Sequence, residues 1–157
     1  MCEYCGCQAV PAVEALTREH DLVVNLIGGV RAAHAAGDMP GMAVLVGRIA
    51  AVLGPHTAVE EEGLFPALVA DFPDHVAALH VEHRRIEAVL GEAASGVPAD
   101  PGWPVRLLET LSMLREHILK EQDGVFPAAL ATLGPADWDV VDAVRSRVGT
   151  LLPATGG

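Results

Sequence analysis

The stretch HTAVEEEGLFP at residues 56–66 returns in altered form at residues 117–127 as HILKEQDGVFP. Both copies fit the pattern H-x-x-x-E-x-x-G-[LV]-F-P. Each copy is preceded by a second shared motif, L-x-x-E-H, at residues 16–20 and 79–83. The chain therefore resembles a duplicated helical hairpin, and the duplication includes polar residues.

Apolar residues at helical spacing predict four long helices around these motifs. Breaker clusters rich in Gly, Pro and Asp separate them, and such short connections favour an antiparallel up-and-down bundle. A shorter helix is expected after Gly134-Pro135, and Pro55 is expected to kink the second helix. The predicted fold is all-α, a four-helix bundle with an additional C-terminal helix. The helices are expected at about residues 11–36, 41–70, 74–94, from the end of the 95–102 loop to 133, and 136–148.

The composition limits the partners that the chain can have. With 157 residues, half of them apolar and 4% aromatic, the sequence suits one helical domain. Its net charge of −11 argues against nucleic acid or an anionic membrane surface and suits metal cations. No apolar run approaches the roughly 20 residues that span a bilayer, and no signal-peptide plan is present, so a cytoplasmic location is expected. We divide the sequence into a Cys-rich arm (1–10), the bundle (11–133) and a C-terminal helix and tail (134–157).

Two histidine–glutamate pairs carry the candidate chemistry. Residues four apart lie on one face of a helix, so each pair presents an imidazole and a carboxylate to one point. In an antiparallel bundle with an approximate two-fold axis, the pairs converge in the core and are joined by the histidines of the L-x-x-E-H motifs. The six candidate residues are His20, His56, Glu60, His83, His117 and Glu121.

Such a cluster predicts a metal site. Two unpaired carboxylates inside an apolar bundle would be costly, and cations remove that cost. Imidazole suits iron, zinc, copper and nickel, while carboxylates that can each bridge two ions suit iron or manganese pairs. The mixture indicates a dinuclear site.

The order H…H-x-x-x-E…H…H-x-x-x-E, with its E-x-x-[LV]-F-P tails, resembles the hemerythrin-like family, the hemerythrin HHE cation-binding domain, over about residues 12–133. The resemblance implies a four-helix bundle enclosing two non-haem iron ions with an oxo or hydroxo bridge. It also implies reaction with dioxygen, hydrogen peroxide or nitric oxide. By position, one iron is expected on His20 and His56, the other on His83 and His117, with Glu60 and Glu121 bridging both.

Two departures from the oxygen-carrying hemerythrins bear on function. Those proteins have a further histidine where this chain has Leu79, and a bridging carboxylate five residues after the last histidine, where this chain has Gln122. A missing ligand leaves a coordination position open, which favours reactivity over reversible oxygen carriage. We expect catalase-like or peroxidase-like consumption of peroxide. The alternative is an oxygen, iron or redox sensor that acts through a protein partner.

Three residues are candidates for the missing ligand: His80, Glu87 and Tyr4. The unrepeated His34 and His75 are expected to be solvated or to cap helices. Glutamates next to the predicted ligands are expected at the surface, because neighbours in sequence point elsewhere on a helix. These surface glutamates are Glu19, Glu61, Glu62, Glu82 and Glu116.

Gly63 and Gly124 each lie seven residues after a motif histidine. Glycine costs about 1 kcal/mol relative to alanine inside a helix, so a repeated one indicates that a side chain would obstruct something. Two explanations stay open for these glycines: they leave room for a small ligand, or they allow close backbone packing beside Phe65 and Phe126.

The arm contains all three cysteines, Cys2, Cys5 and Cys7, which is not a disulfide framework. A zinc or iron–sulfur site would need a fourth ligand, such as His34 or an acidic side chain. The alternatives are a thiol group that meets peroxide or passes electrons to the iron pair, and a flexible reduced tail.

Overall fold

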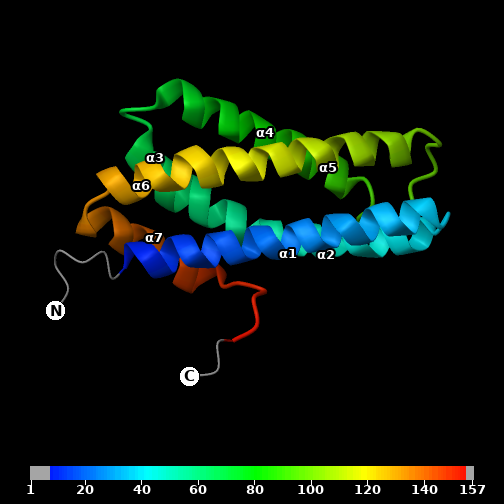
Figure 1. Ribbon diagram of the computed structural model, residues 1–157, viewed down its shortest axis with the longest axis horizontal. Coiled ribbons are helices and arrows are strands. Elements are labelled where there is room, and N and C mark those ends of the chain that lie inside the picture. The colour runs from blue at the N-terminus through cyan, green and yellow to red at the C-terminus, as the bar shows by residue number, and fades with distance from the viewer. Residues whose placement is uncertain (1–7, 155–157) are drawn as a thin grey trace.

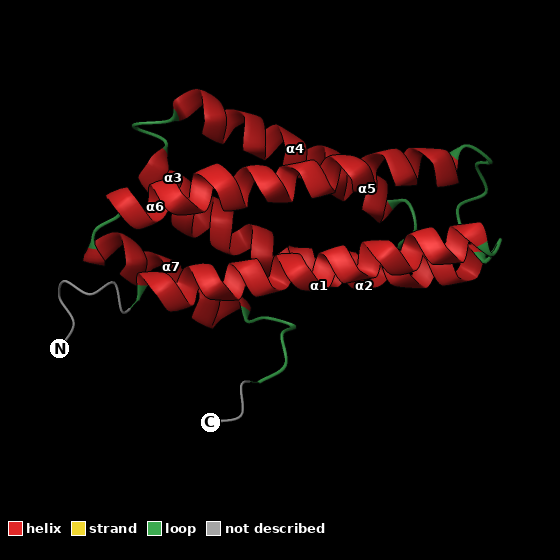
Figure 2. Cartoon of the chain, in the orientation of Figure 1, coloured by secondary structure: helices red, strands yellow, loops and turns green. Residues whose placement is uncertain are grey.

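The computed structural model describes residues 8–154, which fold into an antiparallel bundle of four long helical segments with a fifth helix across one end (Figure 1). Within these residues all regular structure is helical (Figure 2). The predicted all-α fold with an added C-terminal helix is confirmed. The elements are α1 (Ala9–Ala35), α2 (Met39–Val59), η1 (Glu60–Leu64), α3 (Phe65–Leu68), α4 (Pro73–Gly91), α5 (Trp103–Lys120), η2 (Glu121–Val125), α6 (Phe126–Thr132) and α7 (Pro135–Val148).

Local sequence explains where the helices begin and end. The Asp38 side chain accepts a hydrogen bond from Gly41 N at 2.9 Å and caps the start of α2. The turn before it contains Gly37 at φ 70°, a left-handed conformation that glycine adopts without strain. Asp137 accepts from the backbone N–H of Gly134 and caps the start of α7. Gly149, at φ 74°, follows the end of α7.

The second and fourth long helices each contain a π-helical turn at the repeated motif. The backbone N–H of Phe65 donates to the carbonyl of Glu60, and that of Phe126 donates to the carbonyl of Glu121, so the bond spans five residues instead of four. A proline follows each phenylalanine and has no N–H to donate. Pro55 does not end α2, which stays α-helical to Val59. The sequence did not predict the π turns.

Two apolar clusters fill the bundle. One, around Ile27, Met42 and Trp103, lies toward the connection between α1 and α2; the other, around Leu16 and Phe65, lies toward α7. In α7 the buried residues are the three predicted to pack on the bundle, Trp138, Val141 and Val144.

The segment Met39–Leu68, formed by α2, η1 and α3, is long and apolar enough to cross a membrane, with a mean hydropathy of 1.5 over its most apolar window. Polar and charged residues, among them Arg48, His56 and Glu60, interrupt it, so it contains no continuous apolar run of that length. Here it contributes residues to both apolar clusters and packs against α1, α4 and α7. A core helix of a bundle can have the same length and composition, so these two properties are weak indications of a membrane span.

Candidate metal centre

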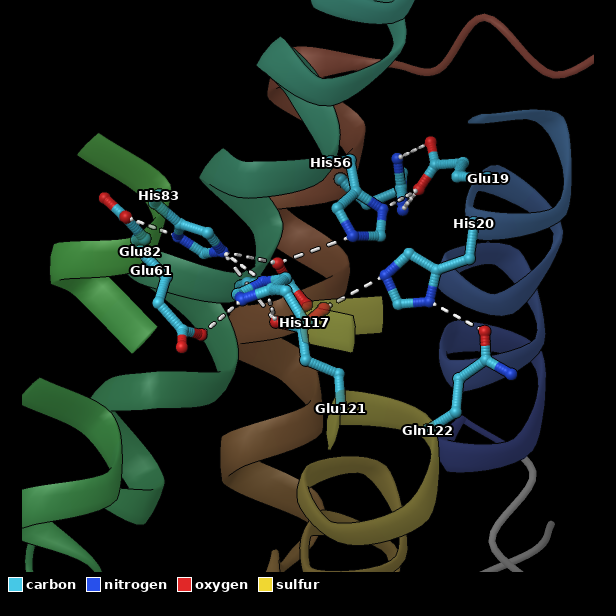
Figure 3. A network of polar contacts seen from close by, with 11 residues as sticks. Glu19, His20, His56, Glu61, Glu82, His83, His117, Glu121 and Gln122 are labelled. Carbon is cyan, nitrogen blue, oxygen red and sulfur yellow. Dashed lines mark hydrogen bonds and ion pairs between the residues drawn. The ribbon is translucent and has the colours of Figure 1, made fainter. Parts of the chain in front are cut away.

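In Figure 3, the side chains of His20, His56, His83, His117 and Glu121 point toward one another. With Glu60 they make six buried side chains, from all four long helical segments, that meet in the core of the bundle. They are the six that the sequence singled out, and none is more than 5% exposed. They form two groups that share both glutamates, and within each group one ligand atom per residue lies within 4.8 Å of the others. The first group is His20, His56, Glu60 and Glu121; the second is Glu60, His83, His117 and Glu121.

In each histidine, Nε2 faces the shared carboxylates. His20 Nε2 lies 3.0 Å from Glu121 Oε1, and His56 Nε2 lies 3.4 Å from Glu60 Oε1. In the second group, His83 Nε2 lies 3.3 Å from Glu60 Oε1 and His117 Nε2 lies 3.2 Å from Glu121 Oε2. The Nε2 atoms of His83 and His117 are 3.1 Å apart, a separation that suits two nitrogens each about 2 Å from one ion.

The centre contains buried polar atoms that find no hydrogen-bond partner in the protein. These atoms are both carboxylate oxygens of Glu60, Oε2 of Glu121 and Nε2 of His56. A buried acceptor without a donor costs about 1–3 kcal/mol, and more when it is charged. All four are atoms that coordinate cations, so the residues present fit a pair of metal ions.

The opposite ring nitrogen, Nδ1, of every histidine has its own acceptor. His56 Nδ1 donates to Glu19 at 3.0 Å, and His117 Nδ1 donates to Glu82 at 2.7 Å. These acceptors are the glutamates of the two L-x-x-E-H motifs. Each therefore positions the other histidine of its own hairpin.

Acceptors for the remaining two histidines come from the opposite hairpin. His20 Nδ1 donates to Gln122 Oε1 at 3.0 Å, and His83 Nδ1 donates to Glu61 Oε2 at 2.7 Å. Glu61 and Gln122 each follow a shared glutamate directly. With Nδ1 as donor, Nε2 of each neutral imidazole is free to bind a metal.

The expected surface position is wrong for three of the glutamates. Glu19 is fully buried, and Glu61 and Glu82 are 27% and 21% exposed at their side chains while bonding to histidines. Each of these glutamates points away from the face of its own helix that carries the ligands, but that direction leads to a neighbouring helix and not to solvent. Glu62 and Glu116 are exposed, as predicted.

Glu19 also joins the centre to the C-terminal part of the chain. Arg145 donates to both of its carboxylate oxygens, at 2.8 and 2.7 Å, and Thr150 Oγ1 donates at 2.6 Å. With the bond from His56, one buried carboxylate accepts four hydrogen bonds. Sequence reasoning missed Arg145 and Thr150, because neither lies within the repeat.

The phenylalanine of each repeated motif packs against a histidine of the other hairpin. Phe126 stacks on His20 with ring centroids 5.4 Å apart, and Phe65 stacks on His83 at 5.7 Å. Both phenylalanines are buried. The repeated F-P tail thus restricts the orientation of the imidazoles.

The shared carboxylates raise the pKa values of three histidines of the centre, His56, His83 and His117. Burial opposes protonation of His56, but Glu60 and Glu19 outweigh it and raise its pKa to about 10. For His83, burial is likewise outweighed by Glu121 and Glu60, which raise the pKa to about 11. Burial alone would raise the pKa of Glu121, yet the neighbouring His117, His20 and His83 hold it well below its ordinary value. The carboxylates thus favour positive charge at this point of the core.

The sequence over residues 12–129 matches the family model described as the hemerythrin HHE cation binding domain. The chain belongs to this family. The family resemblance expected from the motifs is thereby confirmed. A search of curated proteins and a search of solved structures each returned no significant match.

A cavity of ≈220 Å³ adjoins this hemerythrin-like centre. All six residues line it, together with an apolar wall. Exposed residues of α2 and α4 also line it, so it reaches the surface between these two helices. The apolar wall is Leu53, Ile86, Leu90, Leu114 and Ile118, and the exposed residues are Ala50, Gly54, Glu87 and Gly91.

The candidates for an additional ligand lie outside both groups of the HHE centre. His80 Nδ1 faces Glu61 Oε2 at 3.3 Å, and Glu87 is an exposed residue of the cavity. Tyr4 lies outside the described residues, as do Cys2, Cys5 and Cys7. His34 and His75 are exposed, as expected. Leu79, at the position of the missing histidine, is buried in the apolar cluster next to α7.

The two repeated glycines have different surroundings. A Cβ atom at Gly63 would lie 3.1 Å from Val141 Cα, so this glycine permits close packing of α7. A Cβ atom at Gly124 would meet nothing within 4 Å. Neither glycine lines the cavity beside the centre. Close packing explains Gly63, whereas Gly124 lines a second cavity, of ≈440 Å³, with residues of α4 and α6, so the ligand interpretation stays open for Gly124 alone.

Proposed function

We propose that the chain binds two non-haem iron ions at these six residues and reacts with hydrogen peroxide, dioxygen or nitric oxide, with peroxide consumption favoured. The observation that carries this is the pair of buried groups that share Glu60 and Glu121, in which three of the four carboxylate oxygens have no hydrogen-bond partner in the protein. His20 and His56 would hold one ion, and His83 and His117 the other. We also propose that the protein acts in the cytoplasm, as its sequence led us to expect.

The protein's own contribution is to fix the ligands. Hydrogen bonds at Nδ1 hold each imidazole in one tautomer, and the stacked phenylalanines restrict the rings. When bound, an iron pair supplies open coordination positions and one-electron redox steps at this point. No side chain of the described residues takes the place of the histidine replaced by Leu79.

The cavity suits small uncharged ligands. Its walls are apolar, and Glu87 at the surface disfavours anions. In a catalase-like reaction, two molecules of hydrogen peroxide give one of dioxygen and two of water. One peroxide molecule is oxidised while the other is reduced, so no external reductant is required.

The test is to load the purified chain with ferrous iron and measure iron content, absorption spectrum and dioxygen release from peroxide. We expect about two irons per chain, near-ultraviolet or visible absorption from a bridged pair, and release over many turnovers. His117→Ala should abolish release, while His34→Ala, which removes an exposed histidine, should not. Release that stops after one equivalent would contradict the enzymatic function, and absence of a bound iron pair would contradict the whole proposal.

A sensor function is the second candidate, and the Glu19 network favours it. This carboxylate connects His56 to Arg145 and Thr150, so a change at the centre has a direct route to the C-terminal segment. Hydrogen exchange of residues 135–154 should then differ between the iron-loaded and iron-free protein, as a protein partner would require. Equal exchange in both forms would count against a sensor.

A further inference from the structure

The two ion positions have different charges beside them. The residue that directly follows each shared glutamate accepts the Nδ1 hydrogen bond of a histidine. For His83 this acceptor is the carboxylate of Glu61, and for His20 it is the amide of Gln122. The equivalent positions of the repeat thus differ by one negative charge.

Acceptors of the other two histidines do not offset this difference. Both are glutamates, and each is paired with a basic side chain: Glu19 with Arg145 and Glu82 with Lys120. Among the described residues, no lysine or arginine forms an ion pair with Glu61, whose further neighbour is His80 Nδ1 at 3.3 Å. Counted with their basic partners, the Nδ1 acceptors of His83 and His117 therefore carry one more negative charge than those of His20 and His56.

A carboxylate hydrogen-bonded to a metal-binding imidazole makes the imidazole a stronger donor, and a nearby negative charge stabilises a more positive ion. Glu61 is 27% exposed at its side chain, so solvent screens part of its effect. The bond of 2.7 Å to Nδ1 still couples its charge directly to His83.

We propose that Glu61 and Gln122 make the two positions electronically unequal, so that the position formed by His83 and His117 keeps the higher charge when the pair is reduced by one electron. This inference rests on the proposed function, because it presupposes an iron pair. Neither residue contacts the reacting atoms. Both are positioning residues that act through the histidines.

The test is a titration of the diferric protein with dithionite and mediator dyes, followed by optical spectroscopy. Each electron converts one ferric ion to ferrous and lowers the charge of the centre by one. We expect two one-electron steps, the first at His20 and His56 and the second at His83 and His117.

The two single variants should act on different steps with the same consequence. Glu61→Gln removes a negative charge beside the position formed by His83 and His117, so it should raise the reduction potential of the second step more than that of the first. Gln122→Glu adds a negative charge beside the position formed by His20 and His56, so it should lower the reduction potential of the first step more than that of the second. Each variant should therefore bring the two reduction potentials closer together by at least about 59 mV, which corresponds to a tenfold smaller comproportionation constant.

The exchange variant Glu61→Gln/Gln122→Glu provides the check against a general charge effect, since its net charge is unchanged. In this variant the two reduction potentials should be as far apart as in the wild type, but the position formed by His83 and His117 should now be reduced first. Glu62→Gln is the matched control, because it removes a neighbouring carboxylate that pairs with Arg147 and contacts no histidine. It should leave the separation unchanged.

A single two-electron step in the wild type would overturn the inference. So would two single variants that move the separation in opposite directions or leave it unchanged. Iron content separates the two proposals. A chain with two irons and equal potentials keeps the proposed function and contradicts this inference, whereas a chain that takes up no iron pair contradicts both.

Discussion

The two hairpins use the same plan of two histidines and one glutamate, but different neighbours hold them in place. In the first hairpin, Glu19 is fully buried and is held by Arg145 of α7. In the second, Glu82 is partly exposed and is held by Lys120 of its own hairpin. Equal motifs therefore do not imply equal environments, and the C-terminal helix completes the surroundings of one hairpin only.

The largest effect should come from the residues that the two hairpins share. Glu60→Gln and Glu121→Gln each remove a carboxylate from both groups at once, so both ions should be lost together, with affinity reduced more than about 100-fold. Iron content after gel filtration measures this. A variant that keeps one iron per chain would show that the carboxylates are not shared.

A large effect of pH is expected in both hairpins. The pKa of His56 is raised to about 10 and that of His83 to about 11 from 6.5, so both are protonated at pH 7 in the metal-free protein. Their contribution to stability is fully present below pH 6.5 and is lost as pH rises through these raised values.

Metal uptake must displace these protons, and the pKa of His117 is raised as well, so the apparent affinity should rise between pH 7 and 9 with release of at least about two protons per chain. Calorimetry in buffers with different ionisation enthalpies counts them. Uptake without proton release would show that the histidines are neutral before the metal binds.

Removal of the two motif glutamates should reveal the unequal neighbours. Glu19→Ala leaves a partly buried Arg145 and a buried His56 without their acceptor, so we expect a loss of about 3 kcal/mol or more in unfolding free energy. Glu82→Ala also leaves a buried histidine, His117, without its acceptor, but the basic partner Lys120 is exposed, so the loss should be smaller, about 1–2 kcal/mol. Urea denaturation of the metal-free variants compares them, and equal losses would contradict the special role of α7.

The smallest effect should have opposite signs in the two hairpins. Gly63→Ala places a Cβ atom 3.1 Å from Val141 Cα and should destabilise the protein by about 1 kcal/mol. Gly124→Ala meets open space and should stabilise it by up to about 1 kcal/mol, since alanine favours helix. Thermal unfolding of both variants measures the difference, and a shift of the same sign in both would contradict it.

The sequence alone was sufficient to predict the five helical segments and the six residues that meet in the core. Apolar periodicity locates the helices and the repeated motif identifies the six residues, because residues four apart lie on one face of their helix regardless of which helices pack against it. Glu19 and Glu82 were assigned to the surface by the same reasoning, since their position relative to their own histidine says nothing about an adjacent helix. Their occurrence in both L-x-x-E-H motifs was the signal that could have corrected this.

Other features could not be predicted from motifs. Arg145 reaches the centre only because α7 folds back over η1, and the packing that allows this depends on Gly63 and Val141. The π turns depend on hydrogen bonding between Glu60 and Phe65 that the residue pattern does not specify.

The exchange of contacts between hairpins has a consequence for how such a chain can assemble. Phe126 and Gln122 serve His20, while Phe65 and Glu61 serve His83, so neither hairpin contains the complete surroundings of its own histidines. A single hairpin of this plan could complete such a centre only by pairing with a second copy. Two fragments separated at the loop between α3 and α4 should accordingly regain their native structure only as a complex.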